Sequence, residues 1–81
     1  MPTFARIGPY RFYVYSHEPN EPPHIHADRD EKSAKFWLDP VSLAKNFGFR
    51  ASELTIIRNI IVANRKPFLD EWHEFFDNRR R

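Results

Sequence analysis

The chain has 81 residues, 16% of them aromatic, and contains no cysteine. A chain of this length builds one compact domain, and its high aromatic content excludes a disordered polypeptide. The absence of cysteine excludes disulfide bonds, thiolate nucleophiles and cysteine-based metal sites. The net charge of +2 is too small to indicate nucleic-acid binding by itself.

Neither a membrane segment nor a signal peptide is evident in the sequence. No apolar stretch approaches the roughly 20 residues of a membrane-spanning helix, and the first residues lack the charged and then apolar layout of a signal peptide. We therefore expect a cytoplasmic protein without a membrane partner. The three arginines at residues 79–81 are expected to form a basic tail that aids solubility or binds anionic partners weakly.

The first half of the chain shows the alternation that is typical of β-strands. We predict strands over residues 3–7 and 10–15, joined into a hairpin by Gly8 and Pro9. Three prolines within residues 17–23 exclude both a helix and a central strand, so this segment is predicted to be an extended surface loop.

Two further strands are predicted over residues 24–28 and 33–38, separated by a polar turn at residues 29–32. An antiparallel hairpin about this turn determines which residues face each other. The facing pairs are His24 with Trp37, His26 with Lys35, and Asp28 with Ser33.

This register gives the predicted sheet two distinct faces. The apolar face, which helices should cover, consists of Phe12, Val14, Ile25, Ala27, Ala34, Phe36 and Leu38. The polar face consists of Arg11, Tyr13, Tyr15, His24, His26, Asp28, Lys35 and Trp37. Aromatic and titratable residues alternate on the polar face, which makes it the candidate functional surface.

The second half of the chain is predicted to be helical. Apolar residues recur at helical spacing over residues 51–63 and again from Pro67 to about residue 77. Ser52 or Arg50 is the predicted cap of the first helix. The apolar stripe of the second helix consists of Phe68, Leu69, Trp72, Phe75 and Phe76.

The predicted fold class is α+β, in a single domain spanning residues 1–81. A four-stranded, mainly antiparallel β-meander carries a C-terminal helix pair on one face, so Phe12 and Phe36 are expected to be buried against Trp72 and Phe76. The predicted parts are the β-meander at residues 1–39, a connecting segment at 40–50, a helical hairpin at 51–77 and a basic tail at 78–81.

The most distinctive local feature is the segment 22–26, with the sequence PPHIH. The prolines impose an extended entry, and the period of two along a strand places His24 and His26 on the same face. Two histidines can share a metal ion, but a complete site needs one or two more ligands, for which His17, Asp28 or a partner chain are the candidates. We predict no metal and no cofactor; if a metal binds, His24 and His26 are the ligands.

Nucleic-acid binding is one hypothesis for the polar face, because rings such as Tyr13 and Trp37 can stack on bases while Arg11 and Lys35 contact phosphates. A protein interface is the second hypothesis, since exposed aromatic residues are also typical of interfaces. Acidic residues within the 24–38 hairpin favour a protein partner over nucleic acid.

A third hypothesis is metal-independent RNA cleavage. It requires a histidine as general base, a cation that stabilises the transition state, and a tyrosine or histidine that protonates the leaving oxygen. No spacing rule makes such a set specific, so whether the protein is an enzyme stays open. The candidate catalytic residues are His24, His26, Tyr13 and Arg11, and the candidate binding residues are Tyr15, Trp37, Lys35 and His17.

A structural role is the alternative to all three hypotheses. In that case the C-terminal tail or the segment 40–49 folds over the polar face. His24 and His26 would then be buried and hydrogen-bonded in a second small core, and the polar face would have no ligand.

Several segments together resemble a small bacterial family known as domain of unknown function 4160, and the resemblance covers nearly the whole chain. The segments are the opening Met-Pro-Thr, IGPYRF at 7–12, EPPHIH at 21–26, SAKFWL at 33–38 and WHEFF at 72–76.

The resemblance implies a function through the genes that lie beside those of family members. They are often encoded beside a second small protein, in an arrangement similar to a type II toxin–antitoxin pair. The chain is therefore expected to be a toxin-like component that acts through the polar face, with the neighbouring protein as its antitoxin. RNA and a second copy of the chain are the other expected partners. The alternative is a non-enzymatic module that binds protein or nucleic acid.

Overall fold

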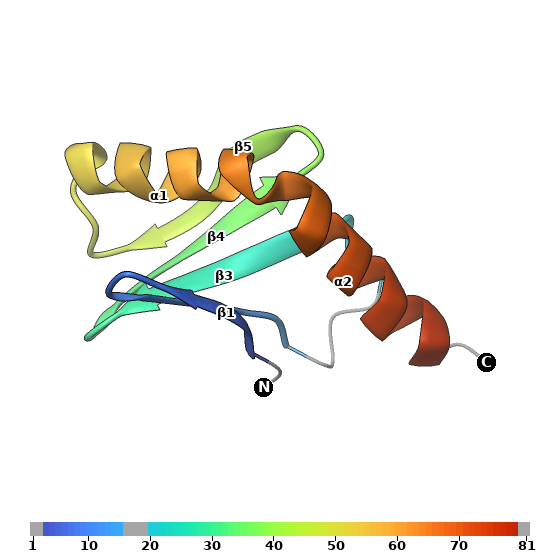
Figure 1. The fold of residues 1–81 in the computed structure, drawn as a ribbon. Coiled ribbons are helices and arrows are strands. Elements are labelled where there is room, and N and C mark those ends of the chain that lie inside the picture. Colours follow the sequence, from blue (N-terminus) through green and yellow to red (C-terminus); the bar gives the residue numbers. More distant parts are fainter. Residues whose placement is uncertain (1–2, 16–19, 80–81) are drawn as a thin grey trace.

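The structure, a computed structural model, describes residues 3–15 and 20–79, with side chains as far as residue 76. The strands within these residues form one sheet in the order β1-β2-β3-β4-β5, and each pairs antiparallel with the next. Both helices follow the sheet and lie on the same side of it (Figure 1). The elements are β1 (Thr3–Ile7), β2 (Tyr10–Tyr13), β3 (His24–Arg29), β4 (Lys32–Leu38), β5 (Val41–Phe47), α1 (Ala51–Ala63) and α2 (Arg65–Arg79).

The α+β class and the first four strands agree with the sequence prediction. The predicted register between β3 and β4 is confirmed at all three pairs, including His26 opposite Lys35. The neighbouring strand places Tyr13 opposite His26 on the other side. β2 is shorter than predicted, because it ends at Tyr13 and not at Tyr15.

The prediction for residues 40–50 was wrong, because this segment contains a fifth strand and is not an irregular connection. A turn at Asp39 and Pro40 reverses the chain, and β5 then pairs with β4. The pairing shifts once between Lys35 and Phe36, which marks a β-bulge in the hairpin. A bulge interrupts the period-two alternation by which a strand is recognised in a sequence.

The bulge places the odd-numbered residues before and after it in β5 on opposite faces of the sheet. Leu43 lies opposite Phe36 and therefore belongs to the apolar face. Beyond the bulge, Lys45 lies opposite Lys35 and belongs to the polar face. Phe47 follows two residues later on that same face. The polar face therefore gains Lys45 and Phe47, which the sequence prediction did not include.

The hydrophobic core lies between the apolar face and the helices, as predicted. Phe12 and Phe36 are buried in the same cluster as Trp72 and Phe76 of α2. The ring of Phe12 also packs against Phe68, with 5.4 Å between centroids. Large aromatic side chains therefore contribute much of the buried area of this small domain.

The N-terminus of α1 is held on the sheet by side-chain bonds. Arg50 is the N-cap but makes no side-chain capping bond. In the first turn Glu53 accepts hydrogen bonds from the Arg29 guanidinium, at 2.5 and 2.7 Å, and from the Tyr10 hydroxyl, at 2.8 Å. α1 spans its predicted residues, whereas α2 begins two residues before Pro67.

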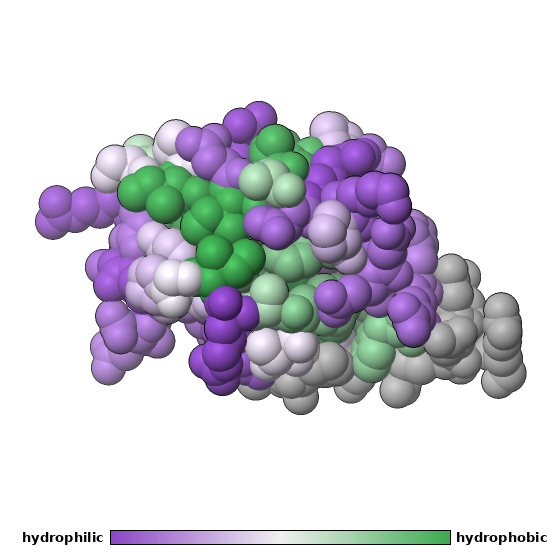
Figure 2. All heavy atoms as spheres, viewed as in Figure 1, coloured by the Kyte–Doolittle hydropathy of each residue, from purple (hydrophilic) through white to green (hydrophobic). Residues whose placement is uncertain are grey.

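The helix side of the molecule also carries exposed apolar residues. Ile56 and Val62 on α1 are 52% and 47% exposed. Figure 2 shows apolar atoms gathered along α1 and continuing toward the sheet below it. None of the helices within the described residues is long and apolar enough to cross a membrane.

Candidate functional site

The candidate catalytic residues form a continuous row of contacts across β2 and β3. The guanidinium carbon of Arg11 lies 4.6 Å from the centroid of the Tyr13 ring. Tyr13 stacks on His26, with 5.3 Å between centroids and 21° between planes. His26 in turn meets His24 edge to face at 5.3 Å. The structure thus brings the four predicted residues together.

Tyr13 is held in place by its hydroxyl group. It donates a hydrogen bond of 3.0 Å to Oδ1 of Asp28, and its oxygen lies 3.4 Å from the hydroxyl of Tyr15. Burial raises the pKa of Tyr13 above its usual range, and the hydrogen bond with Tyr15 and the charge of Asp28 act in the same direction. The phenol therefore keeps its proton at neutral pH and fixes the ring against His26.

The polar face is less exposed than the sequence analysis expected. His24, His26 and Lys35 are 0%, 8% and 6% exposed, and Tyr13 is buried as well. The structural hypothesis expected buried histidines beneath either the C-terminal tail or the segment 40–49. His24 and His26 are indeed buried, but residues 41–47 form β5, which extends the sheet at its edge.

His24 occupies an enclosed position at the start of β3. Its Nδ1 lies 2.9 Å from the carbonyl oxygen of Pro22, and its ring contacts those of Trp37 and Trp72 at 6.0 and 6.2 Å. Figure 1 shows α2 passing this end of β3. The position of His24 is that of a packed and hydrogen-bonded residue, whereas His26 reaches the open part of the face.

Lys35 forms an ion pair that the sequence analysis did not predict. Its ammonium group contacts the carboxylate of Glu21 and lies 4.9 Å from the centroid of the Trp37 ring. The same carboxylate is 3.7 Å from Nδ1 of His24. Glu21 directly precedes the PPHIH segment, so its position in the sequence was the available signal.

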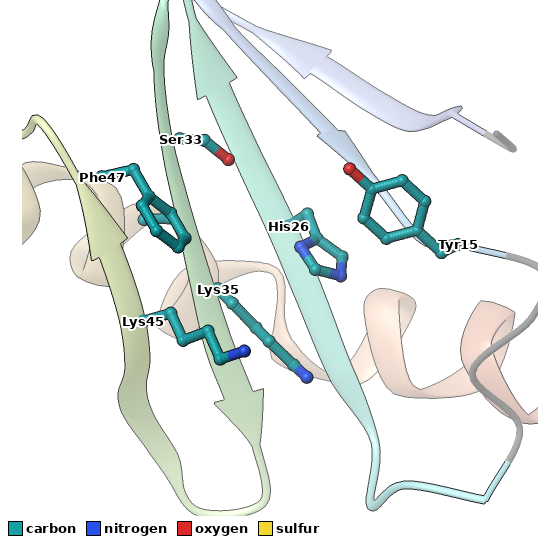
Figure 3. Close-up of a pocket in the computed structure, with 7 residues that line it drawn as sticks. Tyr15, His26, Ser33, Lys35, Lys45 and Phe47 are labelled. Carbon is teal, nitrogen blue, oxygen red and sulfur yellow. The ribbon is translucent and has the colours of Figure 1, made fainter.

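A pocket of about 210 Å³ opens on the polar face (Figure 3). The side chains of Lys35 and Lys45 extend toward the same end of it, while Phe47 and Tyr15 lie on opposite sides of His26. Lys45 and Phe47 were missed because the strand that carries them was missed. The pocket is lined by Tyr15, His26, Ser33, Ala34, Lys35, Lys45 and Phe47.

The remaining sequence predictions concern His17, the basic tail and a bound metal ion. His17 and the end of the basic tail, residues 80–81, lie outside the described residues. Within the described part of the chain, no group of three or more histidine, cysteine or acidic side chains is arranged to hold a metal ion. His24 and His26 therefore offer two ligands there, which is half of a tetrahedral shell.

Comparison with known protein families assigns the chain to one of them. The model of one family, Domain of unknown function (DUF4160), matches residues 10–73. This region contains β2 to β5, α1, part of α2 and every residue that lines the pocket. The chain belongs to this family. The match to DUF4160 confirms the resemblance found in the sequence; no curated protein and no solved structure matches the chain.

Proposed function

We propose that this DUF4160 protein binds single-stranded RNA through the pocket on its polar face. One observation supports this more than any other: Lys35, Lys45 and His26 line the same small pocket as the rings of Tyr15 and Phe47. Ammonium groups neutralise phosphates, and aromatic rings stack on bases of any sequence. The pocket offers both kinds of contact close together, since Lys45 and Phe47 stand two residues apart on β5.

Two of the three acidic hairpin residues that favoured a protein partner, Asp28 and Asp30, are engaged within the domain. Asp28 accepts a hydrogen bond from Tyr13. Asp30 is paired with Arg29 at 3.0 Å. Their charges are therefore partly compensated, and neither residue lines the pocket. This arrangement favours an anionic ligand at the pocket over an acidic interface on the hairpin.

Binding has more support than cleavage from the positions of the catalytic candidates. Of these residues only His26 lines the pocket. His24 is enclosed, and the proton of Tyr13 is directed toward Asp28. The alternative is cleavage by His26, with the lysines stabilising the transition state. The binding experiment would also detect this reaction.

A fluorescently labelled uridine oligonucleotide tests the proposed binding by anisotropy. The affinity should fall steeply between about 50 and 200 mM salt, because counterions are released on binding. Lys45→Ala should weaken binding, whereas Lys66→Ala should not, since Lys66 lies on α2 in an exposed pair with Asp70. Absence of binding at low salt, or equal loss in the two variants, would contradict the proposal; shortening of the oligonucleotide would show cleavage.

The family resemblance supports a cellular setting for this binding. In that setting the chain is the toxin-like component of a type II toxin–antitoxin-like module, and the protein encoded beside it is the antitoxin. Expression of the chain alone should slow growth, and co-expression of the neighbour should relieve the inhibition. Unimpaired growth of cells that express the chain alone would contradict the module, while RNA binding would still be tested by anisotropy.

A further inference from the structure

One end of the pocket concentrates positive charge. Lys35 and Lys45 are register partners on adjacent antiparallel strands, and both belong to the polar face. Like charges directly opposite each other destabilise a sheet. The carboxylate of Glu21 pairs with Lys35, whereas no carboxylate within residues 3–15 and 20–76 forms an ion pair with Lys45. This end of the pocket therefore suits a second anionic group.

The rest of the pocket is small and flanked by aromatic rings. Its volume of about 210 Å³ lies below the roughly 300–1,000 Å³ that is typical of sites for drug-sized molecules. Phe47 lines the pocket and is 63% exposed, so its ring offers a face for stacking. A ligand that combines one anionic group with one flat ring matches these two ends.

We propose that the pocket takes one nucleoside monophosphate unit, with its phosphate at Lys35 and Lys45 and its base against Phe47. This inference rests on the proposed function and specifies the ligand of the same pocket. The unit is supplied either by a single strand of RNA or by a free nucleotide. These two sources present the same chemistry and are distinguished by experiment.

Glu21 has a defined role in this arrangement. Its carboxylate already contacts the ammonium group of Lys35, so a phosphate that approaches Lys35 meets a like charge. Glu21 therefore opposes binding of the phosphate. Glu21→Gln keeps a hydrogen-bond acceptor for Lys35 and removes the negative charge, so this variant should bind the unit more tightly than the native protein.

Titration with uridine monophosphate, uridine and inorganic phosphate, followed by NMR, tests the inference. The monophosphate should bind more tightly than either fragment and should shift the signals of Phe47 and Lys45. Phe47→Ala should weaken its binding roughly tenfold, as expected for the loss of one stacked base. Lys45→Ala should weaken binding of the monophosphate and of phosphate, but not of uridine. Glu21→Gln should tighten both phosphate-containing ligands, and Lys66→Ala serves as the matched control.

The outcomes separate this inference from the proposed function. If the oligonucleotide binds at the polar face but the monophosphate is insensitive to Phe47→Ala and Lys45→Ala, the inference is wrong and RNA binding stands. If the monophosphate binds as described and the oligonucleotide does not, the ligand is a free nucleotide and the proposed function is wrong. If neither ligand binds, both are wrong.

Discussion

Lys35 and Lys45 lie directly opposite each other on neighbouring strands of the polar face. Lys35 is buried and paired with Glu21, whereas Lys45 is exposed. An arrangement of this kind costs folding free energy through repulsion, and the cost falls when an anion binds between the two charges. The pair therefore links the stability of the β4–β5 hairpin to the proposed ligand.

Lys45→Gln should make the protein slightly more stable while it impairs ligand binding. Removal of the repulsion should raise the free energy of unfolding by about 0.2–0.5 kcal/mol at low ionic strength. The gain should shrink at high ionic strength, because salt screens the exposed charge. Urea unfolding at low and high salt measures both effects, and a variant that is less stable than the native protein at low salt would contradict the repulsion.

Glu53→Gln should change the acid stability of the protein. The hydrogen bonds from Arg29, followed by that from Tyr10, lower the pKa of Glu53 to about 2. The ionised carboxylate thus contributes stability that is fully present above its ordinary pKa of 4.5 and is lost as the pH falls toward 2. Urea unfolding over this range should show a flatter pH profile for Glu53→Gln than for the native protein; parallel profiles would show that the contact with Arg29 contributes nothing.

Tyr13→Phe should reduce the alkaline sensitivity of the fold. Because the pKa of Tyr13 is raised by burial, the folded state favours the protonated phenol, and this stability is lost as the pH rises above the ordinary value of 10.0. Tyr13→Phe should cost about 0.5–1.5 kcal/mol at neutral pH, through the lost bond to Asp28, and should then lose less stability at high pH. Urea unfolding at neutral and alkaline pH measures both quantities, and an equal alkaline loss in the two proteins would rule out this role of Tyr13.

Phe36→Ala should destabilise the protein strongly, because Phe36 is 1% exposed in the core. Deletion of a buried aromatic ring typically costs about 3–5 kcal/mol. Phe47→Ala is the matched control on the opposite face; its ring is 63% exposed, so its cost should stay within about 0.5 kcal/mol. Comparison of the thermal midpoints tests the assignment of the two faces, which an unchanged midpoint of Phe36→Ala would refute.

Much of the fold could be predicted because its signals are local. The polar turn between β3 and β4, combined with a period of two, determined the pairing of His26 with Lys35 and so the composition of both faces. Helical spacing of apolar residues gave α1 at its observed bounds. The same local patterns placed Arg11 and Tyr13 on one face with the two histidines.

Other parts of the site depend on contacts that no local pattern records. The bulge in β5 reverses the facing of its side chains, so Lys45 and Phe47 reach the polar face against the simple alternation of the strand. The contacts at the polar face were also not predicted, because Glu21 pairs with Lys35 and Trp72 of α2 packs against His24 across the fold.

The sequence by itself determined the strands β1 to β4, the register of β3 with β4, the helices and the segregation of apolar from polar residues, because each of these follows from the spacing of neighbouring residues along the chain. Only the tertiary structure decided which polar residues form a pocket. The pocket depends on a fifth strand paired at the sheet edge, and one of its lysines, Lys35, pairs with Glu21. Both contacts arise only when these segments fold against each other.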